Sequence, residues 1–76
     1  MNNNLIPHAV VSHVVDGATP IRAWREHLNL TQEEVAKRLG ISQPAFAQQE
    51  SVAKPRRATR ARIAGAFGIH AGQLEL

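Results

Sequence analysis

The segment TQEEVAKRLGISQPAFAQQE, residues 31–50, constrains the fold of this chain more than any other stretch. Thr31 and Glu34 have the spacing of a capping box, in which a hydroxyl and a carboxylate satisfy free amides at a helix start. That helix is predicted to end at Gly40, because glycine adopts the positive φ of a helix C-terminus without strain. Ser42 is then placed to cap a second helix. Two short helices around a tight glycine turn indicate a helix-turn-helix.

Further helices are predicted on both sides of this pair. Apolar residues recur at helical spacing around Trp24, which predicts a helix over residues 20–29 with Trp24 in the core. Downstream, Thr59 is placed to cap a helix that Gly68 ends, and a short last turn follows. These five helical segments after residue 19, with no strand among them, predict an all-α fold.

An N-terminal extension over residues 1–19 is expected to precede the helix-turn-helix domain, residues 20–76. Residues 2–4 are expected to be a disordered start, and apolar residues at every fourth position from Ile6 to Val14 predict a short helix. The valine content also allows a strand. Such an apolar segment can pack across a dimer interface, dock on another protein or fold back on its own domain. The sequence leaves these uses open.

Length and composition limit the class of protein. A chain of 76 residues is expected to form one domain with a small core. It has no cysteine, so disulfides and thiolate metal sites are excluded. No run approaches the ~18 apolar residues of a membrane span, and the start lacks the basic region of a signal peptide. A soluble, cytoplasmic protein is therefore expected.

Catalysis and metal binding are both disfavoured by the distribution of reactive side chains. Ser12, His13 and Asp16 are close in sequence, but nothing around them indicates an orienting arrangement, and a domain this small has little room for one. The four histidines lack the i, i+4 spacing that places two ligands on one helix face. We expect neither an enzyme nor a metal or other cofactor.

Positive charge is concentrated in the last third of the chain. The formal net charge is +3, with a balance of −1 through Ala53 and +4 from Lys54 onward. The basic residues of this last part are Lys54, Arg56, Arg57, Arg60 and Arg62. A basic cluster beside a helix-turn-helix is what the neutralisation of DNA phosphates requires.

The second helix of the pair carries side chains suited to reading bases. Amides can pair with the donor and acceptor of adenine in the major groove, and the first turn of a recognition helix lies deepest there. Gln43 is thus the strongest candidate for a base contact, followed by Gln48. Pro44 and Ala47, on nearby faces, are candidates for contact with thymine methyl groups.

Other residues are better suited to the DNA backbone. Gln32 opens the first helix of the pair, where free amides and the helix dipole favour a phosphate. Further candidates for phosphate contacts are Arg22, Lys37, Arg56 and Arg57.

Residues 21–76 resemble the helix-turn-helix domain of the Xre/Cro and phage-repressor family. The resemblance rests on IRAWREHLNLTQEEVAKRLGIS, on Glu50 at the end of the recognition helix, and on RIAGAFGI followed by QLEL. It implies a compact five-helix, lambda-repressor-like bundle that binds operator DNA as a two-fold dimer and represses transcription. It also implies that Arg25 and Glu50 form a largely buried salt bridge that orients the recognition helix.

The sequence is compatible with two functions. The first is a sequence-specific repressor that binds double-stranded DNA as a homodimer. The second is a protein-interaction module, an antitoxin or adaptor whose N-terminal segment binds a toxin or a second regulator. The second draws on LIPHAVV and PIRAWREHL, which resemble the linker that enters the DNA-binding half of some antitoxins.

Overall fold

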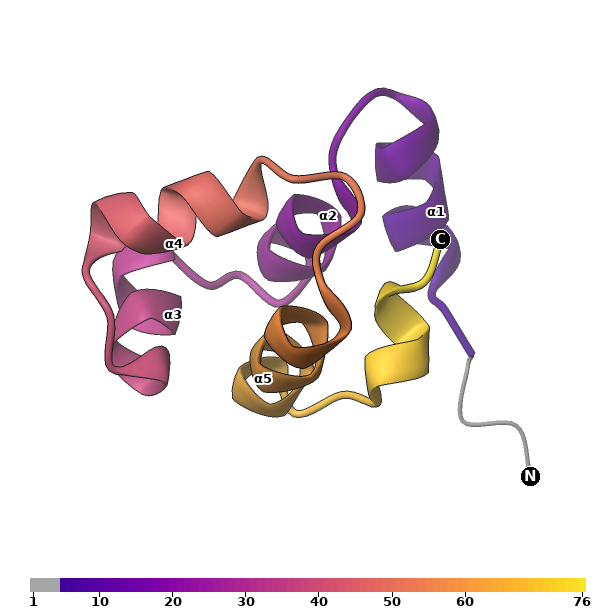
Figure 1. The fold of residues 1–76 in the computed structure, drawn as a ribbon. Helices are drawn as coiled ribbons and strands as arrows, with labels where there is room; N and C mark the ends of the chain where they lie inside the picture. The colour runs from indigo at the N-terminus through magenta and orange to yellow at the C-terminus, as the bar shows by residue number, and fades with distance from the viewer. Residues whose placement is uncertain (1–4) are drawn as a thin grey trace.

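A computed structural model describes residues 5–76, and every regular element in that range is helical. The elements are α1 (His8–Val15), α2 (Pro20–His27), α3 (Gln32–Leu39), α4 (Gln43–Glu50), α5 (Arg57–Phe67) and the 3-10 turn η1 (Ala71–Leu74). Figure 1 shows α3 and α4 on one side of α2, with α1 and η1 on the other. The predicted all-α fold is confirmed. The expected disordered start lies outside the described residues.

The helix pair forms through local interactions. Thr31 Oγ1 accepts from Glu34 N at 3.1 Å, and the Glu34 carboxylate accepts from Thr31 N at 2.9 Å, which completes the capping box. Gly40 ends α3 with a φ of 70°. Ser42 Oγ then accepts from Ala45 N at 3.2 Å and caps α4. Nearby residues therefore set both ends of α3 and the start of α4.

The core lies where α2, α3, α4 and α5 meet. Ile21, Val35, Phe46 and Ile63 contribute one fully buried side chain from each of these helices. Trp24 is also buried, and its Nε1 donates to the carbonyl of Gln73 at 2.8 Å. The indole therefore ties α2 to the C-terminal turn while its ring fills the core.

The N-terminal segment forms a helix that folds back on the domain. α1 packs against α2, and its Val10 is fully buried in the common core. Gln73 Nε2 also donates to the carbonyl of Leu5 at 2.6 Å, so the chain before α1 is fastened to η1. Of the two secondary structures that the valines allow, the helix is the one adopted.

Two predicted helix boundaries were wrong. α5 begins at Arg57 rather than after a Thr59 cap, because the chain turns into helical geometry directly after Arg56, with no side chain capping it. α2 ends at His27 rather than near Asn29. Asn29 takes a positive φ of 58°, which asparagine tolerates better than most residues and which reverses the chain toward α3.

Candidate nucleic-acid interface

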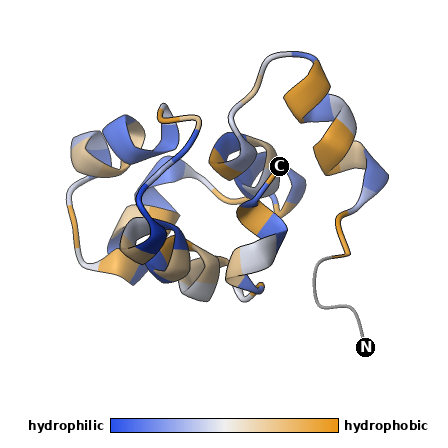
Figure 2. Ribbon diagram, turned by 45° about the vertical axis from the view of Figure 1, so that its right-hand side comes forward, coloured by the Kyte–Doolittle hydropathy of each residue, from blue (hydrophilic) through white to orange (hydrophobic). Residues whose placement is uncertain are grey.

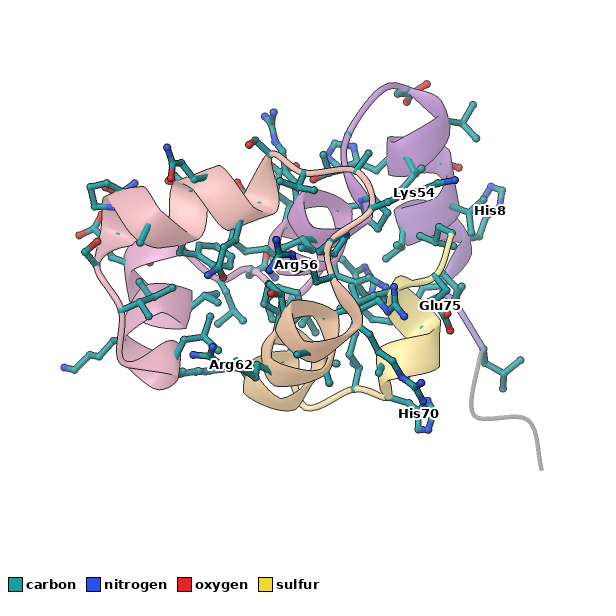
Figure 3. All side chains as sticks on the ribbon, viewed as in Figure 1. His8, Lys54, Arg56, Arg62, His70 and Glu75 are labelled. Carbon is teal, nitrogen blue, oxygen red and sulfur yellow. The ribbon has the colours of Figure 1, made fainter. Side chains whose placement is uncertain are left out.

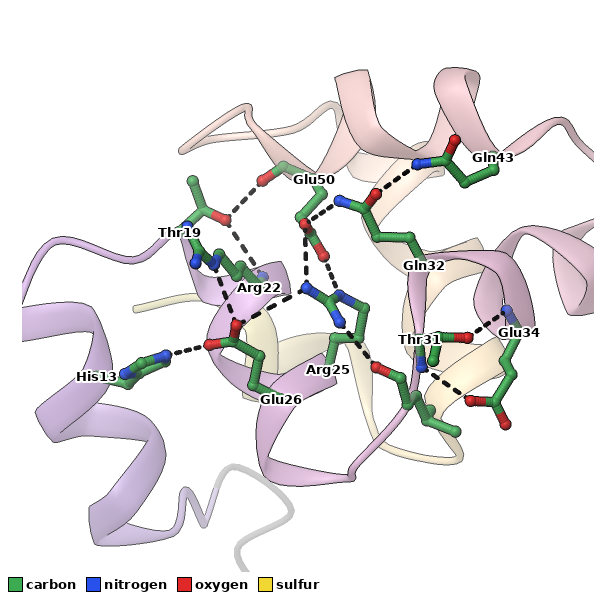
Figure 4. A network of polar contacts seen from close by, with 11 residues as sticks. His13, Thr19, Arg22, Arg25, Glu26, Thr31, Gln32, Glu34, Gln43 and Glu50 are labelled. Atoms are coloured by element: carbon green, nitrogen blue, oxygen red, sulfur yellow. Dashed lines mark hydrogen bonds and ion pairs between the residues drawn. The ribbon is translucent and has the colours of Figure 1, made fainter.

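The first residues of α3 and α4 meet at one edge of the domain. Gln43 Nε2 donates to Gln32 Oε1 at 2.6 Å, and both side chains are partly exposed (Figure 4). Each glutamine is the first residue of its helix. The contact therefore joins Gln32, a predicted contact to the DNA backbone, to Gln43, a predicted contact to a base.

Behind this pair lies a buried carboxylate. Gln32 Nε2 donates to Glu50 Oε1 at 2.7 Å, and Glu50 is only 5% exposed. Arg25 Nε donates to the other carboxylate oxygen of Glu50, and Arg25 Nη1 donates to the carbonyl of Leu30 at 2.8 Å. The structure thus contains the ion pair between Arg25 and Glu50, joining α2 to the end of α4 (Figure 4).

Glu50, Gln32 and Gln43 form a hydrogen-bond relay in which each amide can adopt only one orientation. A carboxylate has no hydrogen to donate, so Glu50 requires the amide nitrogen of Gln32 to face it. The amide oxygen of Gln32 then faces Gln43 and takes one hydrogen from its Nε2. Gln43 is left with a free Oε1 acceptor and one free N–H donor.

The outer face of α4 carries the remaining candidates for base contact. Phe46 and Glu50, one turn apart, are buried against the core. On the opposite side of the helix, Pro44 and Gln48 are exposed at i, i+4 spacing. Ala47 is half-buried and lies one turn after Gln43. The four candidates therefore form one continuous strip along α4 that points away from the core.

The C-terminal end of α4 is held by Thr19, which is not among the predicted site residues. Thr19 Oγ1 donates to the carbonyl of Glu50 at 2.6 Å. The same oxygen accepts from Arg22 N at 3.2 Å and caps α2. The sequence signal was a threonine directly before Pro20, the usual order of an N-cap and the first helical residue.

The predicted phosphate contacts differ in their exposure and in whether they already form an ion pair. Arg56 and Arg57 are exposed at the start of α5, and Lys37 is exposed on α3. Among residues 5–76, none of these three takes part in an ion pair. Arg22 is 57% exposed but pairs with Glu26 within α2 at 3.3 Å. An exposed pair of this kind is weak enough to exchange for a phosphate.

The basic cluster of the sequence does not act as one unit. Arg60 Nη2 lies 3.4 Å from the Glu75 carboxylate, so this arginine already has an acidic partner. Lys54 points toward α1, while Arg62 lies on the side of α5 nearest α3 (Figure 3). The connection that leads into α5 is strongly hydrophilic (Figure 2). Arg56 ends this connection and Arg57 begins α5, and both are exposed.

A second polar contact fastens α1 to α2. His13 Nε2 contacts Glu26 Oε1, and the other oxygen of Glu26 receives Arg22 Nε and lies 3.9 Å from Arg25 Nη2. The hydrogen bond from His13, followed by the nearby Arg22 cation, holds the pKa of Glu26 below its usual value. Glu26 therefore connects α1 with the arginine that braces α4.

The geometry of the site matches the result of comparison with known families. Residues 21–45 match a family model described as "Helix-turn-helix". Over these residues the chain is similar to the Xre/Cro-like helix-turn-helix family. The match runs from the first core residue of α2 into the first turn of α4, and so includes both Gln32 and Gln43. A helix-turn-helix domain of this family supports the function of a DNA-binding regulator.

No match was found among curated proteins or among solved structures. Within residues 5–76, no group of three or more histidine or acidic side chains is arranged to hold a metal ion. No helix in that range is long and apolar enough to cross a membrane.

Proposed function

We propose that this protein is a transcriptional repressor that binds a palindromic operator in double-stranded DNA as a homodimer. The observation that carries the proposal is the contact between Gln32 and Gln43, which places paired amides at the adjoining N-termini of two helices. In this arrangement α4 enters the major groove with its first turn, while the start of α3 lies against the DNA backbone. Gln32 braces Gln43 from that position.

The free groups of Gln43 match adenine. Its Oε1 accepts from the adenine N6 amino group, and its remaining N–H donates to N7. Gln48 reads a neighbouring base along the same strip, and Pro44 and Ala47 contact thymine methyl groups. The backbone contacts come from Gln32, Arg22, Lys37, Arg56 and Arg57.

The size of the reading surface supports a homodimer. One short recognition helix covers few base pairs, and helix-turn-helix proteins gain specificity by binding two half-sites about 34 to 36 Å apart on one face of the duplex. Selection of bound sequences from a random duplex pool tests the proposal. We expect a palindrome with adenine at the Gln43 position and half-sites one helical turn apart. Recovery of unrelated sequences contradicts the proposal.

A second candidate function is supported by the outer face of α1. Val15 is 79% exposed and Val11, one turn before it, is 38% exposed. This face suits an interaction with another protein, as in an antitoxin or adaptor. Because Val10 belongs to the core, deletion of α1 would disturb the fold, so the double variant Val11→Ser, Val15→Ser is the better test. Loss of dimerisation together with operator affinity assigns the face to the dimer interface, and unchanged dimerisation leaves it for a different protein.

A further inference from the structure

We infer that Glu50 determines base specificity without touching DNA, because its negative charge sets the donor and acceptor pattern that Gln43 presents. The inference rests on the proposed function and deepens it. Glu50 is 5% exposed, and its Oε1 lies 2.7 Å from Gln32 Nε2. Gln32 Oε1 in turn lies 2.6 Å from Gln43 Nε2. Two hydrogen bonds therefore separate the buried charge from the groups that face the base.

The relay removes an ambiguity that a free glutamine has. A glutamine side chain can rotate its amide by half a turn, exchanging its donor and acceptor at little cost. Here the reversed arrangement places the Gln32 oxygen against the carboxylate of Glu50, two acceptors without a hydrogen between them. One orientation of both glutamines is therefore enforced. Oriented in this way, Gln43 turns its free oxygen toward the base, where it accepts from adenine N6 and repels guanine O6.

Replacement of the charge by an amide reverses the relay. In Glu50→Gln, Arg25 Nε still requires an acceptor, so the new amide turns its oxygen toward Arg25. Its nitrogen then faces Gln32, which must accept through Oε1 and donate through Nε2 to Gln43 Oε1. Gln43 is left with both of its N–H groups free. Two donors match O6 and N7 of guanine rather than the donor and acceptor of adenine.

A second substitution breaks the relay and keeps the buried ion pair. In Gln32→Leu, Arg25 and Glu50 remain paired, but nothing fixes the amide of Gln43. Gln43 then rotates freely and accepts adenine or guanine. Gln49→Leu is the matched control, because this glutamine lies on the same helix as Gln43 and no side-chain hydrogen bond of the described residues involves it.

The experiment measures the affinity of each protein for two operator duplexes that differ only by adenine or guanine at the Gln43 position. We expect wild type and Gln49→Leu to prefer adenine by about 10- to 100-fold, the range expected for a bidentate base contact. Gln32→Leu should lose most of this preference, and Glu50→Gln should invert it. Circular dichroism and thermal melting establish that each variant is folded.

A folded Glu50→Gln that keeps the wild-type preference for adenine overturns the inference and leaves the proposed function intact. If Glu50→Gln does not fold, Gln32→Leu decides, and an unchanged preference there overturns the inference equally. If wild type selects no sequence at all, the proposed function fails and the inference fails with it.

Discussion

Thr19 and Glu50 join the start of α2 to the end of the recognition helix. The Thr19 hydroxyl donates to the backbone carbonyl of Glu50 at 2.6 Å while it accepts from Arg22 N at 3.2 Å. One hydroxyl therefore serves as a helix cap and as a tether between two elements. The carbonyl that it satisfies belongs to the last turn of α4, where no hydrogen bond within the helix is available.

Thr19→Val is expected to lower the free energy of unfolding by about 1 to 2 kcal/mol, because it removes the cap and the tether while keeping the side-chain volume. Chemical denaturation monitored by circular dichroism measures the change. Thr19→Ser, which keeps the hydroxyl, is the control and should retain most of the stability. Equal losses in the two variants would show that the hydroxyl contributes nothing.

Arg25→Met is expected to destabilise the domain by about 3 to 5 kcal/mol, because it leaves the buried carboxylate of Glu50 without its cation. Arg22→Met, which removes an exposed pair with Glu26, should cost less than about 1 kcal/mol. The double variant Arg25→Met, Glu50→Met should recover much of the loss, since no unpaired charge then remains buried. Denaturation curves of the three proteins test this order, and a milder effect for Arg25→Met than for Arg22→Met contradicts it.

The stability of the domain is expected to fall on acidification, in part through Glu26. The pKa of this carboxyl is lower in the folded protein than its ordinary value of 4.5, because it accepts from His13 and lies beside Arg22. The folded state therefore favours the ionised form, and the resulting stability is present above that ordinary value and is lost as the pH falls through the folded pKa. Glu26→Gln should flatten the dependence of unfolding free energy on pH in this acidic window. A variant with the same slope as wild type excludes a contribution from Glu26.

Two substitutions at the interface should affect DNA binding in different ways. Gln43→Ala removes a base contact and should reduce discrimination between operator and non-operator duplexes by about 1 to 3 kcal/mol. Arg56→Ala removes a phosphate contact and should weaken binding to every sequence similarly, with the slope of log affinity against log salt reduced by about 1. Fluorescence anisotropy titrations over a range of salt concentrations separate the two effects. The assignment is wrong if Arg56→Ala changes discrimination and Gln43→Ala does not.

The elements of the helix pair were predictable because their signals are local. The capping box of Thr31 and Glu34, the turn at Gly40 and the cap at Ser42 lie within a few residues of the helices that they delimit. The start of α5 was not predictable in the same way. Thr59 is a good capping residue by type, but the chain enters the helix after Arg56, whose side chain gives no capping signal.

The candidate residues of the site could be selected from the sequence, but their mutual contacts could not. Gln32 was predicted to contact a phosphate, and in the structure its amide also contacts Gln43 and Glu50. These partners are 11 and 18 positions away, and only tertiary packing brings them together. The packing of α1 against α2 could not be predicted for the same reason. An apolar stripe indicates that one face of a helix is buried but does not indicate which element covers it.

If this helix-turn-helix reads a DNA sequence, its affinities for an operator and for an unrelated duplex must differ. The measurement compares binding of the wild-type protein to its selected operator and to a scrambled duplex of the same length and base composition, at one physiological salt concentration. We expect the operator to bind about 10³-fold or more tightly than the scrambled duplex, as specific protein–DNA complexes do. Equal affinity for the two duplexes contradicts this expectation.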